Sequence, residues 1–262
     1  MSADSWDPEQ YHRFAAERRQ PFDDLKALCM PVPDGTIVDL GCGSGELTAE
    51  LHRDLRAART TGVDRSAAML AEAARWAEEV PGLTFEEADL ATWVGTGVDL
   101  VFANASLHWV PDHEGLLARL RLSLAPGGQL AFQVPATFGH PSHVLAAEVA
   151  EEPAFAIPGG HDDVARPGDA VLTPARYAEI LNALGAVQQQ CRLQVYGHQL
   201  ASVEAVVEWV RGSLLTPIRS RLDDATFDAY LDRYRERLLE ELGQQRPYFY
   251  AFSRILCWAR FP

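Results

Sequence analysis

The sequence predicts an α/β fold of the doubly wound type, and three observations support this prediction. Short apolar runs alternate with amphipathic segments between residues 36 and 134. The first apolar run ends at Asp39-Leu40 and is followed directly by Gly41, Gly43 and Gly45. A second apolar run ends at Asp64, about twenty residues after these glycines. A strand, a glycine turn and a helix, with an acidic residue after the next strand, are typical of a nucleotide-binding sheet.

The elements of the sheet follow in order from their periodicity. A first helix is predicted over residues 7–19, with Asp7 as N-cap and Pro8 at the first helical position. We expect strands at 36–40, 60–64, 83–87, 98–103 and 129–134. We expect helices at 45–55, 66–79 and 113–125, the last of them ended by Pro126-Gly127-Gly128. This alternation predicts a parallel sheet covered by helices on both faces.

The second half of the chain is less regular. Residues 135–172 contain several prolines, glycines and histidines in a stretch too long for an ordinary loop, which predicts a lid or insert. Thr173-Pro174 predicts the start of a helix that ends at Gly185. We expect the remaining elements to be a strand at 187–196, helices at 202–211 and 223–242, and a strand at 248–258.

Composition and charge exclude several classes of function. The net charge of −14 argues against a nucleic-acid partner. The N-terminus does not resemble a signal peptide, and no apolar run approaches the roughly twenty residues of a membrane span. Four widely spaced cysteines indicate reduced thiols. We therefore expect a cytoplasmic protein, monomeric or weakly homo-oligomeric, with a small-molecule substrate and no nucleic-acid, membrane or metal partner.

The spacing of the glycines indicates which cofactor the loop binds. Dinucleotide-binding folds use Gly-x-Gly-x-x-Gly, whereas this chain has Gly-x-Gly-x-Gly with Asp39 two residues before it. The pattern resembles motif I of class I S-adenosylmethionine methyltransferases. S-adenosylmethionine is therefore the expected cofactor, and an NAD dehydrogenase is disfavoured by the spacing.

Within that superfamily the chain is similar to the trans-aconitate methyltransferase group over nearly its whole length. The matching segments are Trp6-Asp7-Pro8, Phe14-Ala15-Ala16-Glu17-Arg18, Asp39 to Gly45, Ala67-Ala68-Met69-Leu70, Glu87-Ala88-Asp89, Phe102 to Leu107, Trp109, Pro111-Asp112-His113, Trp209-Val210 and Arg254. The resemblance implies one class I domain with seven strands in the order 3-2-1-4-5-7-6, the seventh antiparallel. Its implied parts are a helical cap (1–30), a cofactor-binding core (31–134), the lid (135–172) and C-terminal strands with substrate-side helices (173–262).

The resemblance also implies a set of cofactor-binding residues. Asp64 suits the ribose diol, and Asp89 suits the adenine amino group, although capping a turn is its alternative role. The full set is Asp39, Gly41, Cys42, Gly43, Gly45, Asp64, Arg65, Met69, Asp89, Leu90, Asn104 and Ser106. We expect no catalytic role for Cys42, because its position in the loop requires only a small side chain.

The acceptor side leaves two reactions open. Arg18 and Arg254 suit a bidentate grip on a carboxylate, which favours carboxyl O-methylation, with surface salt bridges as their alternative role. His108 is either the catalytic base for carbon or nitrogen methylation of an aromatic or isoprenoid metabolite, or part of the pocket wall. The other candidate substrate residues are Tyr11, Phe14, Trp109, His140 and Trp209. A non-catalytic cofactor-binding protein is a third, less favoured class.

Overall fold

The computed structural model describes residues 15–156, 170–211 and 214–262, with side chains from residue 19 onward. The predicted helix start at Asp7 and Pro8 lies outside the described residues, as do residues 157–169 of the expected lid.

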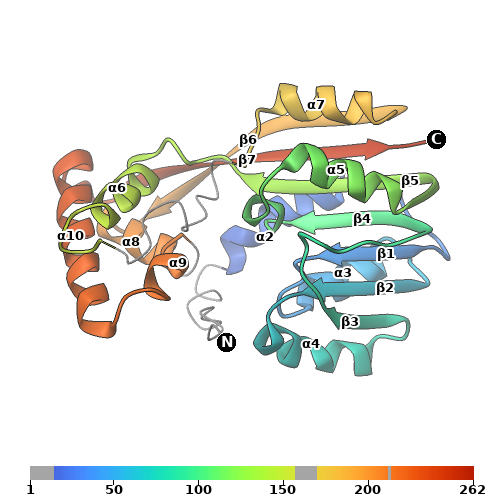
Figure 1. Cartoon of the computed structure of the whole chain (residues 1–262), viewed down its shortest axis with the longest axis horizontal. Coiled ribbons are helices and arrows are strands. Elements are labelled where there is room, and N and C mark those ends of the chain that lie inside the picture. Colours follow the sequence, from blue (N-terminus) through green and yellow to red (C-terminus); the bar gives the residue numbers. More distant parts are fainter. Residues whose placement is uncertain (1–14, 157–169, 212–213) are drawn as a thin grey trace. The chain divides into compact units, whose positions relative to one another are not determined.

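Seven strands form one mixed sheet (Figure 1). The strands are β1 (Thr36–Leu40), β2 (Arg59–Asp64), β3 (Leu83–Glu87), β4 (Val98–Asn104), β5 (Leu124–Pro135), β6 (Gln188–Leu200) and β7 (Tyr248–Arg260). Their order across the sheet is β3-β2-β1-β4-β5-β7-β6. Strands β1 to β5 pair in parallel, and β7 pairs antiparallel with β5, with Pro135 opposite Arg254. The predicted strand order and antiparallel seventh strand are confirmed.

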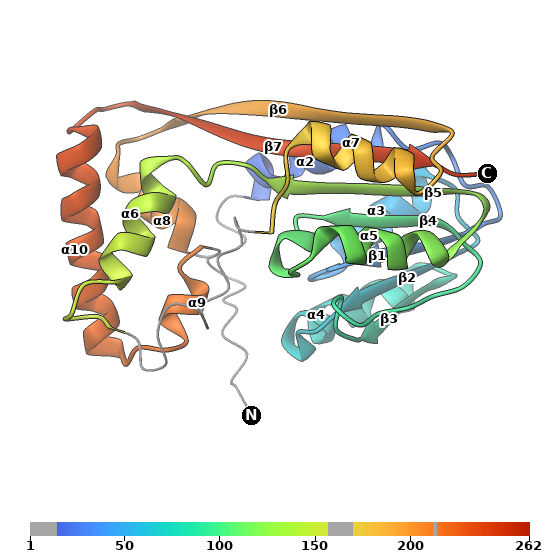
Figure 2. The ribbon, with the colours of Figure 1, turned by 45° about the horizontal axis from the view of Figure 1, so that its top comes forward.

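Helices cover both faces of this sheet (Figures 1 and 2). The helices beside the sheet are α2 (Ala15–Lys26), α3 (Glu46–Asp54), α4 (Ala67–Glu79), α5 (His113–Leu122) and α7 (Pro174–Ala183), with a short 3₁₀ helix η1 (Leu107–Trp109) after β4. Helices α2 and α3 lie on one face, and α5 and α7 lie on the other (Figure 2). The start of α7 confirms the prediction from Thr173-Pro174, because Thr173 caps the helix by accepting the Arg176 N–H.

The core on the α2 and α3 face is apolar and fully buried. Phe22 and Leu25 of α2 and Leu51 of α3 pack against Ile37 and Phe102 of the central strands, and all five are fully buried. The Phe22 and Phe102 rings meet edge to face, with centroids 5.7 Å apart. Burial of these apolar side chains makes the main contribution to the free energy that holds α2 against the sheet.

The N-terminal helix extends further than the sequence predicted. Instead of ending at residue 19, α2 continues to Lys26 with Pro21 inside it. Lys26 Nζ contacts the carboxylates of Glu50 and Asp54 at 2.5 and 2.6 Å. These ion pairs and the buried apolar contacts offset the backbone hydrogen bond that Pro21 cannot make, so the helix continues past the predicted end at residue 19.

The boundary between α5 and β5 also differs from the prediction. Helix α5 ends at Leu122, and β5 already begins at Leu124. The Pro126-Gly127-Gly128 segment therefore lies within the strand, where the register between β4 and β5 is irregular. Gly127 has a φ of 78°, a left-handed conformation that glycine adopts without strain. The turn residues thus form an irregular strand rather than the end of a helix.

By their contacts the described residues form two compact units. The larger comprises residues 18–135, 170–194 and 254–262, and the smaller comprises 15–17, 136–156, 195–211 and 214–253. Strands β6 and β7 contribute residues to both units. The expectation of one domain with four parts stays a prediction.

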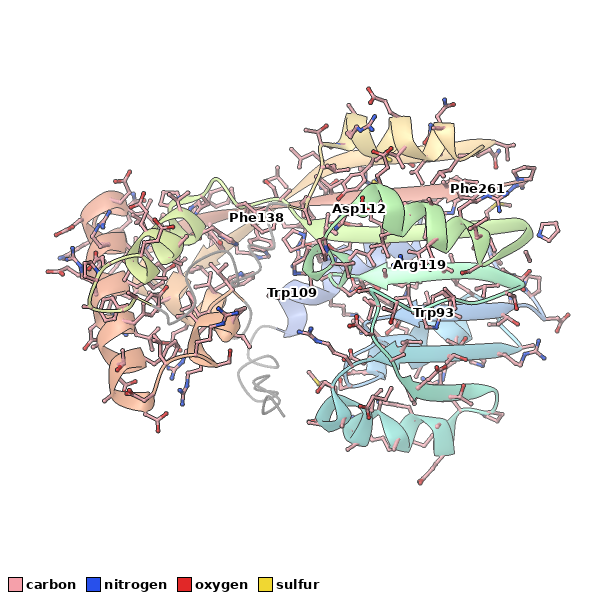
Figure 3. All side chains as sticks on the ribbon, in the orientation of Figure 1. Trp93, Trp109, Asp112, Arg119, Phe138 and Phe261 are labelled. Carbon is pink, nitrogen blue, oxygen red and sulfur yellow. The ribbon has the colours of Figure 1, made fainter. Side chains whose placement is uncertain are left out.

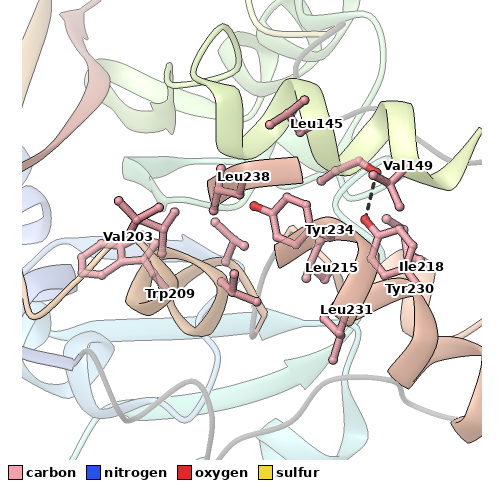
Figure 4. Packing of buried hydrophobic residues seen from close by; sticks show 14 of the residues in the cluster. Leu145, Val149, Val203, Trp209, Leu215, Ile218, Tyr230, Leu231, Tyr234 and Leu238 are labelled. Carbon is pink, nitrogen blue, oxygen red and sulfur yellow. Dashed lines mark hydrogen bonds between the residues drawn. The ribbon is translucent and has the colours of Figure 1, made fainter. Parts of the chain in front are cut away.

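The smaller unit has its own core, built from helices and tyrosines (Figure 4). Its helices are α6 (Pro141–Ala150), α8 (Glu204–Arg211), α9 (Thr216–Arg219) and α10 (Asp224–Leu242). The rings of Tyr230 and Tyr234 stack with centroids 6.2 Å apart. Their hydroxyl groups donate hydrogen bonds to the carbonyls of Ala146 and Ser142, both at 2.8 Å. Helix α6 lies within the expected lid, and α9 and η1 were not predicted.

Among the described residues, no helix is both long enough and apolar enough to cross a membrane.

Candidate active site

The loop between β1 and α3 is a backbone cradle. Gly41, Gly43 and Gly45 all have positive φ, at 80°, 56° and 75°. A Cβ added at Gly41 would lie 2.3 Å from the Cβ of Ser106, whereas one added at Gly43 would have no heavy atom of the described residues within 4 Å. The backbone at Gly41 therefore packs against the protein, and the backbone at Gly43 borders open space. Gly45 is the N-cap of α3, so the loop leads directly into a helix N-terminus.

Asp64, at the end of β2, holds this loop in place. One carboxylate oxygen accepts the Gly43 N–H at 2.9 Å, and the other accepts the Ser66 N–H at 2.9 Å. The amides of Gly41 and Cys42 both donate to the carbonyl of Val63, which ties the loop to the neighbouring strand. The predicted ribose ligand is therefore also a brace for the glycine loop.

Asp39 lies beneath the loop and is almost completely buried. Its Oδ2 accepts a hydrogen bond from Thr48 Oγ1 at 2.6 Å, but its buried Oδ1 has no hydrogen-bond partner among the described residues. Burial raises the pKa of Asp39 to about 7, the Thr48 hydrogen bond opposes this rise, and the nearby Asp64 adds to it. A buried carboxyl oxygen without a partner is suited to a donor supplied by a ligand.

The remaining predicted cofactor residues lie around the same end of the sheet. Met69, in the first turn of α4, is buried, whereas Arg65 is exposed. Leu90 is buried, and the exposed Asp89 accepts the Ala91 N–H at 2.8 Å. Asp89 therefore caps a turn, the alternative role considered for it, and its place against adenine stays a prediction.

These residues fit a cofactor with an amino-acid moiety and a nucleoside. The open space beside Gly43 admits close backbone approach, and the buried Oδ1 of Asp39 suits a cationic donor. Ser106, on the next loop, is buried and donates to the Leu40 carbonyl at 2.5 Å, which fixes the wall opposite Gly41. The residues predicted for the cofactor therefore lie at or after the ends of β1, β2, β3 and β4.

The acceptor half begins with η1, which carries His108 and Trp109. His108 is buried and Trp109 is half-buried, and their ring centroids are 4.8 Å apart. Figure 3 shows Trp109 at the end of the sheet toward which the parallel strands point, with Phe261 at the opposite end. The predicted candidates His108 and Trp109 therefore lie at the edge where α/β folds bind their ligands.

Two residues that sequence reasoning left without a role hold η1 in position. His113 Nε2 lies 2.9 Å from the Leu107 carbonyl, and His113 Nδ1 lies 2.5 Å from the Tyr177 hydroxyl. Because a carbonyl only accepts, Nε2 is the donor, and Tyr177 donates its proton to Nδ1 of a neutral imidazole. Burial lowers the pKa of His113 and raises the pKa of Tyr177, which favours this neutral pair.

A row of polar side chains crosses three adjacent strands beside η1. Gln133 Nε2 donates to Asn104 Oδ1 at 2.6 Å, and Arg254 Nη1 donates to Gln133 Oε1 at 3.2 Å. Gln133 and Arg254 are buried, and Asn104 is half-buried. The structure therefore brings the predicted cofactor residue Asn104 and the predicted substrate residue Arg254 together through Gln133, which was not predicted.

The other predicted substrate residues lie elsewhere. Trp209 is 4% exposed within the core of the smaller unit, where its ring lies 4.7 Å from that of His198. His140 caps α6, and its ring nitrogens contact Ser142 Oγ and Tyr248 Oη, each at 2.9 Å. Their substrate roles stay predictions. Tyr11 and Phe14 lie outside the described residues, and Arg18 is described only by its place in α2.

The sequence did contain signals for the residues that were missed. Gln133 is a polar residue inside the apolar run Ala131 to Val134, which indicates a buried polar contact in the middle of the sheet. His113 lies in a segment that matches the family, but no role followed from the match. The partner of His113, Tyr177, is 64 residues away, so only the folded chain reveals the pair.

Comparison with known proteins adds evidence from the whole chain. Residues 37–128 match a family model described as a methyltransferase domain. The trans-aconitate 2-methyltransferase of Deinococcus radiodurans is 44% identical over 259 residues, which cover 98% of this chain and 99% of that protein. The protein of the same name from Streptomyces avermitilis is 40% identical over 262 residues, which cover 97% and 96%.

Solved structures share the fold at lower identity. The YcgJ protein from Bacillus subtilis superposes with a TM-score of 0.59 at 11% identity, covering 93% of this chain and 98% of that one. The phosphoethanolamine N-methyltransferase 2 of Haemonchus contortus, solved with phosphomonomethylethanolamine and S-adenosylhomocysteine, gives a TM-score of 0.57 at 15% identity, covering 93% and 52%. At these identities the likeness concerns the fold alone.

Proposed function

The chain belongs to the trans-aconitate 2-methyltransferase family and is an S-adenosylmethionine-dependent methyltransferase, and we propose that it methylates a carboxylate oxygen of a small acid such as trans-aconitate. S-adenosylmethionine supplies a methyl group that its sulfonium has already activated. The relatives that carry this name align with nearly the full chain, so the acceptor side of the fold is included in the match.

The observation that carries the proposal is the placement of Arg254. It is a buried cation, 7% exposed, on β7 opposite Pro135, the last residue of β5. A buried arginine is costly unless it has anionic or polar partners. Its contact with Gln133 Oε1 orients one edge of the guanidinium group, and a carboxylate is the ligand that best fits such a planar donor.

The chemistry requires little of the protein beyond placement. A carboxylate has a lone pair available at neutral pH and loses no proton when it is methylated, so no base is needed. The protein then has to align one carboxylate oxygen with the methyl group and exclude water, and such placement can lower the barrier by several kcal/mol. In this mechanism Arg254 binds the acid, and His108 and Trp109 form the pocket wall, while a part for Arg18 in binding stays a prediction from the sequence.

The proposal also covers the cofactor residues, the location and the oligomeric state. We assign the cofactor to the residues around Gly41, Gly43, Asp39 and Asp64, whose geometry fits an amino-acid moiety and a nucleoside. A small-molecule acceptor, a cytoplasmic location and a monomer or weak homo-oligomer stay predictions, in keeping with the net charge of −14.

The direct test is methyl transfer to trans-aconitate, with the methyl ester identified by mass spectrometry. Arg254→Ala should raise the apparent KM by about tenfold or more, because truncation removes an ion pair from a buried site. Arg176→Ala is the matched control, since Arg176 is an exposed arginine paired with Glu114 and Glu179. The control should leave the KM unchanged.

His108→Gln separates this reaction from the base-assisted alternatives. If the acceptor is a carboxylate, the variant should retain most of its activity. If His108 is a general base for carbon or nitrogen methylation, kcat should fall by about a hundredfold or more. A true substrate whose turnover collapses in this variant and ignores Arg254→Ala would refute carboxyl methylation.

A further inference from the structure

The hydrogen bonds along the row Asn104–Gln133–Arg254 all run in one direction, from donor to acceptor, and the chemistry of the side chains determines that direction. Arginine can only donate hydrogen bonds, so the Gln133 atom that contacts Arg254 Nη1 has to be the amide oxygen. The amide nitrogen of Gln133 then faces Asn104, at 2.6 Å. An amide nitrogen can only donate, so the Asn104 atom that it contacts has to be Oδ1. The donor-only guanidinium therefore determines the orientation of two amide groups in succession.

The backbone keeps these three side chains in register. Asn104 and Gln133 are paired residues on β4 and β5, and Gln133 also accepts the Ala105 N–H through its main-chain carbonyl at 3.0 Å. Gln133 is only 1% exposed, so water cannot substitute for either of its partners. A buried amide that is hydrogen-bonded at both ends is costly to rotate. If the Gln133 amide rotated by half a turn, its N–H₂ group would face the donor Arg254 and its oxygen would face the Asn104 oxygen.

We propose that Gln133 is a positioning residue that makes Asn104 present its amide N–H₂ group, and not its carbonyl, to the methyl acceptor. The geometry thereby selects carboxylate oxygens, which only accept hydrogen bonds, over amines, whose N–H groups have to donate them. This inference rests on the proposed function, because it assumes that the acceptor binds beside Asn104 at the end of β4.

The selection follows from complementarity. An amine needs hydrogen-bond acceptors around its N–H groups, and the side-chain oxygen of Asn104 is turned toward Gln133. A carboxylate needs donors, and Asn104 Nδ2 and Arg254 can supply them from the two ends of the row. A site built to donate rejects a ligand that also has to donate, since two buried donors would face each other.

Two substitutions that keep the size of the side chain test the direction of the row. Asn104→Asp preserves an oxygen for Gln133 and replaces the outward N–H₂ group with a second oxygen. Gln133→Glu removes the donor that faces Asn104, so that Asn104 rotates to donate to the new carboxylate and turns its carbonyl outward. Each variant should lower kcat/KM for trans-aconitate by about tenfold or more, chiefly through KM. Because Asn104 is itself a predicted cofactor residue, the affinity for S-adenosylhomocysteine is compared in Gln133→Glu, where it should change by less than about threefold.

Gln129→Glu is the matched control. Gln129 is also buried on β5, and its amide group contacts Met30 and Trp258 near the start of the strand. The same substitution there should leave kcat/KM for the acid within about twofold, because Gln129 does not contact Asn104 or Arg254. If Gln133→Glu does not fold, Gln133→Met supplies the test without a buried charge, and it should also raise KM.

A spectroscopic measurement makes the test independent of turnover. The side-chain amide signal of Asn104, assigned by its loss in Asn104→Asp, should shift when trans-aconitate is added to the complex with S-adenosylhomocysteine. An unchanged signal, or an Asn104→Asp variant as active as the wild type, would overturn the role of Gln133. A wild-type enzyme that methylates no carboxylic acid would instead refute the proposed function, so the two failures are distinguishable.

Discussion

The two halves of the candidate site lie at the same end of one sheet but are built differently. After β1 and β2 the contacts are made by backbone: Gly41 and Gly43 form the loop, and Asp64 braces it through main-chain amides. After β4 and β5 the contacts are made by side chains from distant elements, such as Gln133 with Arg254, 121 residues apart.

This difference indicates how each half responds to substitution. A backbone cradle depends on conformations that only glycine adopts cheaply, so a single added methyl group is damaging. A side-chain network depends on donor and acceptor pairing, so the same shape with a different polarity changes its selectivity. The cofactor half should therefore be sensitive to size, and the acceptor half should be sensitive to hydrogen-bond direction.

The largest effect is expected from Gly41→Ala. The added Cβ would lie 2.3 Å from Ser106 Cβ at a φ of 80°, so overpacking and left-handed strain both act. We expect the free energy of unfolding to fall by about 3–4 kcal/mol. The Cβ of Gly43→Ala meets no atom of the part of the chain that the structure describes within 4 Å, so chemical denaturation should show a loss of only about 1 kcal/mol. Equal losses would contradict the description of one packed and one open glycine.

The next largest effect is expected from loss of Asp64, which braces the glycine loop. Asp64→Ala removes the acceptor of the Gly43 and Ser66 amides as well as the predicted ribose ligand. We expect the binding of S-adenosylmethionine to weaken by about 1.5–3 kcal/mol, measured by calorimetry. Asp89→Ala is the comparison, because Asp89 is exposed and caps a turn after β3. A smaller loss is expected there, and unchanged affinity in Asp64→Ala would exclude Asp64 from the cofactor site.

A pH-dependent effect is expected from Asp39. Burial raises its pKa from 3.8 to about 7, so the native state retains a proton that the unfolded chain has released. The stability contributed by Asp39 therefore falls as the pH rises from about 4 to 7. Asn cannot ionise, so the variant Asp39→Asn does not lose this stability. The free energy of unfolding of Asp39→Asn, relative to that of the wild type, should therefore be about 1–3 kcal/mol higher at pH 8 than at pH 4. Thermal unfolding of the two proteins without cofactor across this range is the measurement, and a constant difference would contradict the raised pKa.

The smallest effect tests the acceptor half. Tyr177→Phe keeps the ring packed against Phe132 but removes the hydroxyl that donates to His113. We expect a loss of about 1 kcal/mol in unfolding free energy, together with a higher KM for the acid and unchanged cofactor affinity. Tyr230→Phe, which loses one buried hydrogen bond to Ala146, should show a similar loss of stability. An unchanged KM in Tyr177→Phe would show that the position of η1 does not depend on His113.

The prediction of the fold from sequence succeeded where the signals are local. The strand ending at Leu40, the glycines after it and the helix start at Thr173-Pro174 are each encoded within a few residues. The errors arose where distant contacts override a local rule. Helix α2 continues past Pro21 because Lys26 and Phe22 are held by α3 and the sheet, and neither contact is visible in the local sequence.

The sequence by itself indicated the alternating strands and helices of the core and the glycine loop, because periodicity and glycine spacing act between near neighbours in the chain. The family followed from resemblance in segments along nearly the whole chain. Only the tertiary structure decided the direction of the hydrogen bonds in the row after β4 and β5. Asn104, Gln133 and Arg254 come from three strands, and their polarity follows from contact with a guanidinium group that can only donate. Hydrogen-bond direction depends on which side chains meet, and chain folding rather than sequence proximity determines which ones do.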